Sequence, residues 1–303
     1  MKQHDPPNHH RLAPILVTVL AVALLSVMDG FMKAAALAAG AYSAMVCRGL
    51  IGTALTAPLF FGSTGGLPTR AVLKVHALRS TVAAAMALLF FHSLTLLPIA
   101  EAIALSFVAP LIALYLAAVV LGERIAPRAI WASVAGFAGV LVIVAPRMSG
   151  GVPSGSGPEG NWEGIAALLI SAVLYAWNLV LQRQQAQIAR PQEIAFFQNL
   201  FVLLILGLAA PWFFAWPESR AWMHIGISAV IAISASLLMS WGYARAEAQV
   251  LVPLEYTAFV WAALVGWIGF AEPLGLATVL GAAVIVAACI YATRTSPPEA
   301  VAV

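Results

Sequence analysis

The sequence predicts an all-α integral membrane protein with ten transmembrane helices, arranged as two inverted repeats of five helices. Three observations predict this fold. The composition is too apolar for a surface exposed to water, and the apolar residues fall into ten runs of membrane-spanning length. Polar positions in the first half also recur about 149 residues later in the second half.

The composition by itself excludes a soluble domain. Of the 303 residues, 62% are hydrophobic and only 9% are charged, whereas a soluble domain carries about 25% charged residues. The mean hydropathy is +0.96. The net charge of +3 is small and the basic residues lie at the ends of apolar runs, so we expect no nucleic-acid partner. Cys47 and Cys289 lie inside apolar runs, and no metal-ligand spacing is present, so we expect no metal and no other cofactor.

Each apolar run is long enough to form a helix that crosses a bilayer, which takes about 20 residues. The runs are too continuous for barrel strands, which alternate in polarity over about ten residues. The ten expected helices cover residues 12–35, 41–61, 77–94, 98–121, 128–145, 163–183, 192–214, 222–243, 248–270 and 274–292.

The distribution of lysine and arginine predicts the orientation, because cytoplasmic loops are enriched in both. With a cytoplasmic N-terminus, the cytoplasmic side holds Lys2, Arg11, Arg70, Lys74, Arg79, Arg124, Arg128, Arg183, Arg190, Arg245 and Arg294. The opposite side holds only Arg147 and Arg220. We therefore expect the cell inner membrane, with both termini in the cytoplasm as tails formed by residues 1–11 and 293–303.

The two halves are separated by a Gly-, Ser- and Pro-rich stretch, which predicts a flexible periplasmic linker over residues 146–162. A shift of 149 residues aligns Asp29 with Asn178 and Lys33 with Gln182. Each repeat, 12–145 and 163–292, has five spans, an odd number, so the halves have opposite orientations. Many secondary transporters are built in this way.

Ionisable residues inside a span are costly and suggest function. Asp29 and Lys33 lie four residues apart and therefore share one helical face. Arg48 and Glu101 lie at a similar depth in their own spans. The four side chains either form one network that gates or binds a solute in the outer third of the membrane, or Asp29 and Lys33 simply neutralise each other.

The second half offers mainly neutral polar groups. Asn178 and Gln182 are accompanied by Tyr175 and Trp177, and a second group comprises Glu255, Tyr256 and Trp261. A buried carboxylate such as Glu255 is a candidate proton carrier or cation contact; the alternative is a protonated acid that only packs helices. We expect Trp177 and Trp261 to line a cavity.

Two segments resemble one known family. Residues 94–125, LTLLPIAEAIALSFVAPLIALYLAAVVLGERI, are similar to the EamA domain of the drug/metabolite transporter superfamily, and residues 250–274 are similar to its second copy. The resemblance extends from about residue 12 to 292. In the second copy the family's LGE motif is replaced by Phe270, Ala271 and Glu272. Glu123 and Glu272 match the family's loop glutamate, which we interpret as a structural residue at a helix end.

The resemblance implies a ten-helix inner-membrane carrier with a central cavity. We expect a secondary transporter of a small polar, zwitterionic or anionic organic metabolite, working by alternating access and coupled to protons or to exchange. Its partners would be the solute, membrane lipid and a proton, and the protein would be a monomer or homodimer. The alternatives are an exporter of amphipathic drugs or cations and a lipid-modifying membrane enzyme. The short loops carry no catalytic cluster that would favour the enzyme.

Overall fold

The structure, a computed structural model, describes residues 9–63, 66–109, 162–243, 257–272 and 274–293, together with isolated residues between 112 and 142. The described part is helical, and no strand occurs in it. Apart from isolated residues, the expected span 128–145 lies outside the described residues, as do Glu123, Glu255, Tyr256 and the predicted linker up to residue 161.

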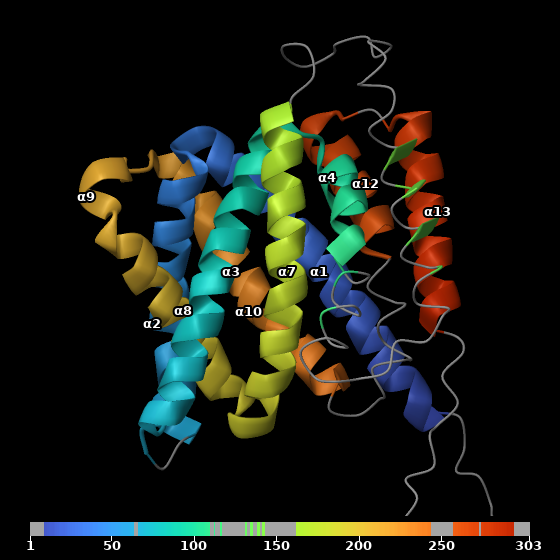
Figure 1. Cartoon of the computed structure of the whole chain (residues 1–303). Helices are drawn as coiled ribbons and strands as arrows, with labels where there is room; N and C mark the ends of the chain where they lie inside the picture. Colours follow the sequence, from blue (N-terminus) through green and yellow to red (C-terminus); the bar gives the residue numbers. More distant parts are fainter. Residues whose placement is uncertain are drawn as a thin grey trace, which may run out of the picture.

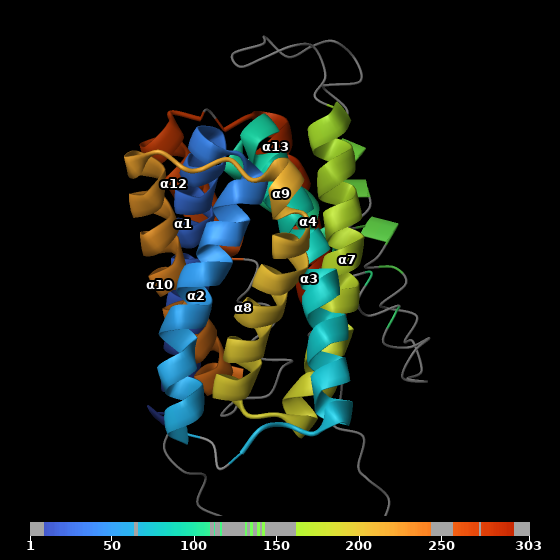
Figure 2. The same ribbon diagram turned by 90° about the vertical axis from the view of Figure 1, so that its left-hand side faces the viewer.

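The helices form one elongated bundle (Figures 1 and 2). Their bounds are α1 His9–Ala39, α2 Ala41–Ser63, α3 Arg70–Leu96, α4 Ile99–Ser106, α7 Trp162–Ile188, α8 Pro191–Leu208, α9 Ala210–Phe213, α10 Ser219–Tyr243, α12 Ala258–Phe270 and α13 Leu276–Thr293. Within the described residues, six helices are long and apolar enough to cross a membrane, and α12 and α13 are shorter apolar helices. The chain is therefore a multi-pass membrane protein.

Local sequence signals explain where these helices end. Gly40 adopts a left-handed conformation with φ of 77° between α1 and α2, which glycine allows without a steric cost. Leu97 is extended before Pro98, and this ends α3. Thr69 caps the start of α3 by accepting a hydrogen bond from the Val72 amide at 3.4 Å.

Two predicted boundaries are wrong. The third span was expected to begin at residue 77, but the Thr69 cap starts α3 earlier, at Arg70. The span expected over 192–214 ends at Leu208 and is followed by the short α9. Pro211 lies in this short helix and has no amide proton to donate, so it cannot continue the hydrogen-bond ladder of α8.

Three helix pairs pack most extensively: α1 with α10, α3 with α7, and α2 with α8. The main hydrophobic core joins these pairs with α4, α12 and α13. The start of α1 and the end of α13 lie at the same end of the bundle, and α3 and α8 both begin there (Figures 1 and 2).

Candidate functional site

A small pocket lies between α2, α3 and α8, inside the bundle. Its volume is about 100 Å³. Its lining is formed by Met45, Arg48, Gly49, Ala83, Met86, Ala87, Gln198, Asn199 and Val202. A guanidinium and two amides thus meet in an otherwise apolar cavity at membrane depth.

Arg48 is held in this pocket by soft, apolar neighbours. Its Nη1 atom lies 3.7 Å from the sulfur of Met28, and its guanidinium lies 5.5 Å from the centre of the Phe91 ring. Asp29 on α1 is close enough to attract it electrostatically. None of the ion pairs among the described residues includes Arg48, so its guanidinium keeps donors that a ligand can use.

The two amides on α8 add hydrogen-bonding groups of different character. The Gln198 Oε1 atom is buried and has no hydrogen-bond partner among the described residues. Asn199 donates to the Ala195 carbonyl at 2.9 Å. Gly52 on α2 leaves the room that Asn199 occupies, because a Cβ atom there would collide with the Asn199 amide.

A second polar contact closes the end of the bundle where α1 ends. Lys33 forms a buried ion pair with Glu272, just after α12. The Lys33 ammonium also donates to the Leu97 carbonyl at 2.7 Å, while the other oxygen of Glu272 accepts from the Ile99 amide at 2.8 Å. Glu272 is thus a structural residue at a helix end, and it is also the charge partner of Lys33.

A third polar cluster, which we call the α3–α7–α8 network, lies toward the opposite end. It comprises Arg79 and His76 on α3, Asn178 and Gln185 on α7, and Glu193 on α8. Arg79 Nε donates to the Asn178 oxygen at 3.1 Å, and Arg79 Nη1 donates to the Gln185 oxygen. Gln185 Nε2 contacts His76 Nδ1, and His76 Nε2 lies 3.0 Å from a Glu193 oxygen.

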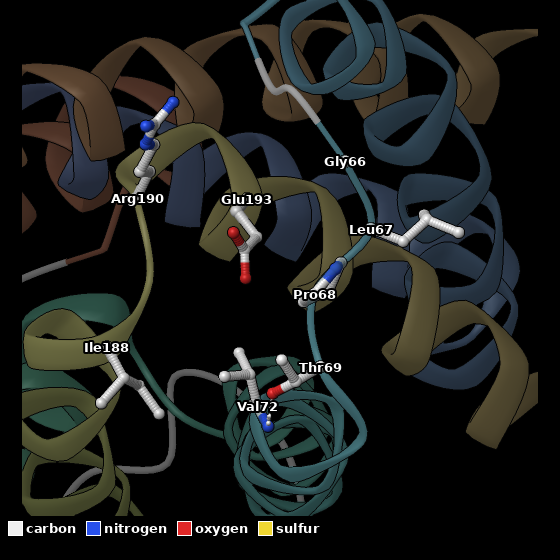
Figure 3. A pocket seen from close by; sticks show the side chains of 8 residues that line it. All are labelled: Gly66, Leu67, Pro68, Thr69, Val72, Ile188, Arg190 and Glu193. Atoms are coloured by element: carbon white, nitrogen blue, oxygen red, sulfur yellow. Dashed lines mark hydrogen bonds between the residues drawn. The ribbon is translucent and has the colours of Figure 1, made fainter.

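A larger cavity of about 390 Å³ opens beside this network. It lies between the start of α3, the end of α7 and the start of α8. Figure 3 shows the Glu193 carboxylate pointing into the opening, with Arg190 at the rim. Exposed Leu67 and Ile188 form part of its wall, so the cavity faces the outside of the bundle.

The residues predicted in the first half are distributed over two contacts instead of one cluster. Asp29 lies with Arg48, whereas Lys33 lies with Glu272. Glu101 is buried in the first turn of α4. Asp29 and Lys33 separate because Glu272, distant in the sequence, offers Lys33 a buried carboxylate of its own.

The residues predicted in the second half also separate. Asn178 is buried and contacts Arg79, and Tyr175 is half-buried nearby on the same helix. Gln182 is exposed, and Trp177 is 41% exposed, so neither lines the interior, contrary to expectation. Trp177 follows the buried Ala176 and precedes Asn178, and this places it on the outer face of α7. The Trp261 Nε1 atom is buried without a hydrogen-bond partner among the described residues.

Sequence reasoning missed His76, Gln185 and Glu193. Their signal was present but weak: Asn178 and Gln185 lie seven residues apart, which places them on one face of a helix. Arg79 was counted among the cytoplasmic basic residues that set the topology, and sequence reasoning did not predict its buried acceptors.

These observations define a class of protein: a multi-pass helical membrane protein with charged and amide groups gathered at membrane depth, as in solute transporters. The model of the EamA-like transporter family matches residues 12–145 and 162–294, so the chain belongs to this family.

Named relatives agree with this assignment. The pseudopaline exporter CntI of Pseudomonas aeruginosa is 28% identical over 93% of this chain and 96% of its own. A riboflavin transporter of Brucella anthropi is 24% identical over 81% of this chain and 85% of its own. The aromatic amino acid exporter YddG of Ancylobacter novellus is 28% identical over 61% of this chain and 64% of its own. These relatives are named as transporters or exporters, which agrees with the transporter family to which this chain belongs.

A solved crystal structure superposes with a TM-score of 0.64, covering 94% of this chain and 99% of that one. At 22% sequence identity this similarity shows the fold alone.

Proposed function

We propose that this transporter carries a small zwitterionic or anionic organic metabolite across the bacterial inner membrane. One observation carries the proposal: Arg48 lies in a pocket at membrane depth, beside two amides, without an ion-pair partner among the described residues. A guanidinium binds a carboxylate through two parallel hydrogen bonds, and such a bond is strong where water is excluded.

The other pocket groups suit the rest of such a solute. The unpartnered Gln198 oxygen accepts a hydrogen bond from an ammonium or hydroxyl group. Asp29 balances the charge of Arg48 when the pocket is empty. The pocket of about 100 Å³ is smaller than ligand pockets of roughly 300–1,000 Å³. It therefore accepts one functional group of a solute in this state, and the bundle opens to admit the remainder.

Alternating access between two inverted five-helix repeats is the mechanism we propose, with ten transmembrane helices in all. Three features support it. The family model matches the chain twice, once in each half. The helices α1 and α7, which the 149-residue shift pairs, run in opposite directions through the bundle (Figure 1). The polar contacts Lys33–Glu272 and Arg79–Asn178 lie toward opposite ends, as gates on two sides of a central pocket would.

The relatives' names support a small organic solute and, in two cases, export. We propose a proton or a counter-solute as the coupling species, with Glu255 as one candidate carrier. The excess of lysine and arginine on one side supports cytoplasmic termini.

Counterflow in proteoliposomes with a panel of amino acids, other carboxylates and neutral metabolites tests this function. We expect uptake of a carboxylate-bearing solute, a large loss of uptake in Arg48→Gln and partial retention in Arg48→Lys. Arg220→Gln, at an exposed arginine at the start of α10, is the matched control and should transport normally. Transport confined to neutral or cationic solutes, or full activity of Arg48→Gln, would overturn the proposal.

A further inference from the structure

The α3–α7–α8 network contains a histidine whose surroundings define its protonation state. His76 is fully buried, with 0% of its surface exposed. Its two ring nitrogens face different partners: Nδ1 faces the Gln185 amide on α7 and Nε2 faces the Glu193 carboxylate on α8. The Phe197 ring stacks on the imidazole with centroids 5.1 Å apart.

Arg79 determines which way the Gln185 amide points. A guanidinium only donates hydrogen bonds, so Gln185 must present its oxygen to Arg79. The NH₂ group of Gln185 then faces His76 Nδ1 and donates to it. With Nδ1 accepting, the hydrogen of a neutral imidazole lies on Nε2 and is donated to Glu193. This arrangement of donors and acceptors fits the neutral imidazole with its hydrogen on Nε2.

A second proton on His76 would disrupt this chain of hydrogen bonds. Imidazolium donates from both nitrogens, so its Nδ1 hydrogen would meet the Gln185 NH₂ group. Turning the Gln185 amide by 180° would present its oxygen to the imidazolium and satisfy that donor. The Gln185 NH₂ group would then face the Arg79 guanidinium, where two donors would meet. Protonation therefore breaks one of the two hydrogen bonds that Gln185 makes with α3, while the new imidazolium charge is attracted to Glu193.

Glu193 connects this buried histidine with the outside. Its carboxylate lies in the cavity of about 390 Å³ shown in Figure 3, together with Arg190 at the rim. Among the described residues, the charged or titratable groups near the network are Glu193 from α8, Arg190 just before α8, Tyr175 from α7, and Arg79 from α3 itself. Histidine is the side chain that proteins most often use as a pH-dependent switch.

We infer that His76, with Glu193, is a proton-binding site whose occupation loosens α3 from α7 at the end of the bundle where α3 begins. The proton comes from hydronium in the solvent outside the bundle, which becomes water; the second N–H bond forms on His76 Nδ1, and Glu193 remains the carboxylate of an ion pair with the imidazolium. The site is separate from the Arg48 pocket, so the inference stands whether or not that pocket binds a carboxylate.

Nitrogen NMR of ¹⁵N-histidine-labelled protein in nanodiscs tests the protonation directly. The signals absent from His76→Gln belong to His76. At about pH 8 we expect the tautomer with hydrogen on Nε2, and at about pH 5 the doubly protonated ring. In Gln185→Glu the new carboxylate accepts from both Arg79 and the imidazolium, so the doubly protonated form should persist to higher pH. A ring that never takes up the second proton, or one unaffected by Gln185→Glu, would overturn the inference.

The helix movement is measured by the distance between spin labels on exposed Lys74 of α3 and Gln184 of α7, with Cys47 and Cys289 replaced by alanine. We expect a longer distance at about pH 5 than at about pH 8, and no pH response in His76→Gln. His92→Gln is the matched control, because His92 on α3 also contacts a glutamate on α7, Glu163, but is exposed. The pH response of the His92→Gln variant should equal that of the unmodified protein. An unchanged distance, or a response that survives in His76→Gln, contradicts the proposed site.

Discussion

Lys33 on α1 and Glu272 beyond α12 form a buried ion pair across 239 positions of the sequence. The same two side chains bind the backbone of the corner between α3 and α4, through the Leu97 carbonyl and the Ile99 amide. Three distant segments of the chain are thus joined at one end of the bundle.

Loss of either charge at this contact should destabilise the protein strongly. Lys33→Gln or Glu272→Gln leaves the other charge buried without its partner, which costs about 3–5 kcal/mol in folding free energy. Thermal unfolding in detergent measures this, and the double variant should lose less than the sum of the two single variants. Asp29→Asn, on the same face of α1, is the control and should leave the coupling between Lys33 and Glu272 intact. Additive losses would show that the pair is not coupled.

Enlarging Gly52 should disturb the Arg48 pocket through Asn199. A Cβ atom at position 52 would collide with the Asn199 side chain, so Gly52→Ala forces α2 and α8 apart or turns the amide. We expect a loss of about 1–3 kcal/mol and weaker ligand-induced stabilisation. Gly62→Ala lies on the same helix, with nothing within 4 Å of the added carbon. This control should leave the unfolding temperature unchanged or slightly raised, and equal behaviour of both variants would refute the argument.

The exposed pair His92–Glu163 should contribute little to stability. Its side chains are 42% and 73% exposed, and solvent screens such pairs to about 0–1 kcal/mol. We expect Glu163→Gln to shift the unfolding temperature only slightly, whereas Glu193→Gln, which alters the partner of the fully buried His76, should shift it more. Thermal unfolding of both variants under identical conditions makes the comparison, and the reverse order would contradict it.

The proposed orientation is tested with reporter fusions. Green fluorescent protein at the C-terminus should fluoresce, and alkaline phosphatase fused there should be inactive, because the proposed orientation puts the C-terminus in the cytoplasm. Alkaline phosphatase inserted within residues 146–161 should be active. An active phosphatase at the C-terminus would invert the topology.

Much of the fold could be predicted from the sequence. Each described long helix overlaps one of the apolar runs, and Gly40 and Pro98 lie at helix ends. The errors lie where a local signal competes with hydropathy. The Thr69 cap extends α3 over the polar residues Arg70 and Lys74, and Pro211 ends a run that hydropathy alone continues.

The candidate site was less predictable, because charge partners are chosen by tertiary packing. Helical spacing put Asp29 and Lys33 on one face, but it contains no information about which distant acid faces Lys33. Likewise, Asn178 and Gln182 share a spacing of four residues, yet α3 covers Asn178 and leaves Gln182 exposed.

By itself, the sequence determined that the chain is a helical membrane protein with costly polar groups inside it, since apolar length and charge scarcity act locally along the chain. Only the tertiary structure decided that Lys33 pairs with Glu272, that Arg48 lines a pocket with Gln198, and that His76 joins a buried chain of hydrogen bonds. Buried polar groups must find partners wherever the packed helices bring them, and that geometry is a property of the whole bundle.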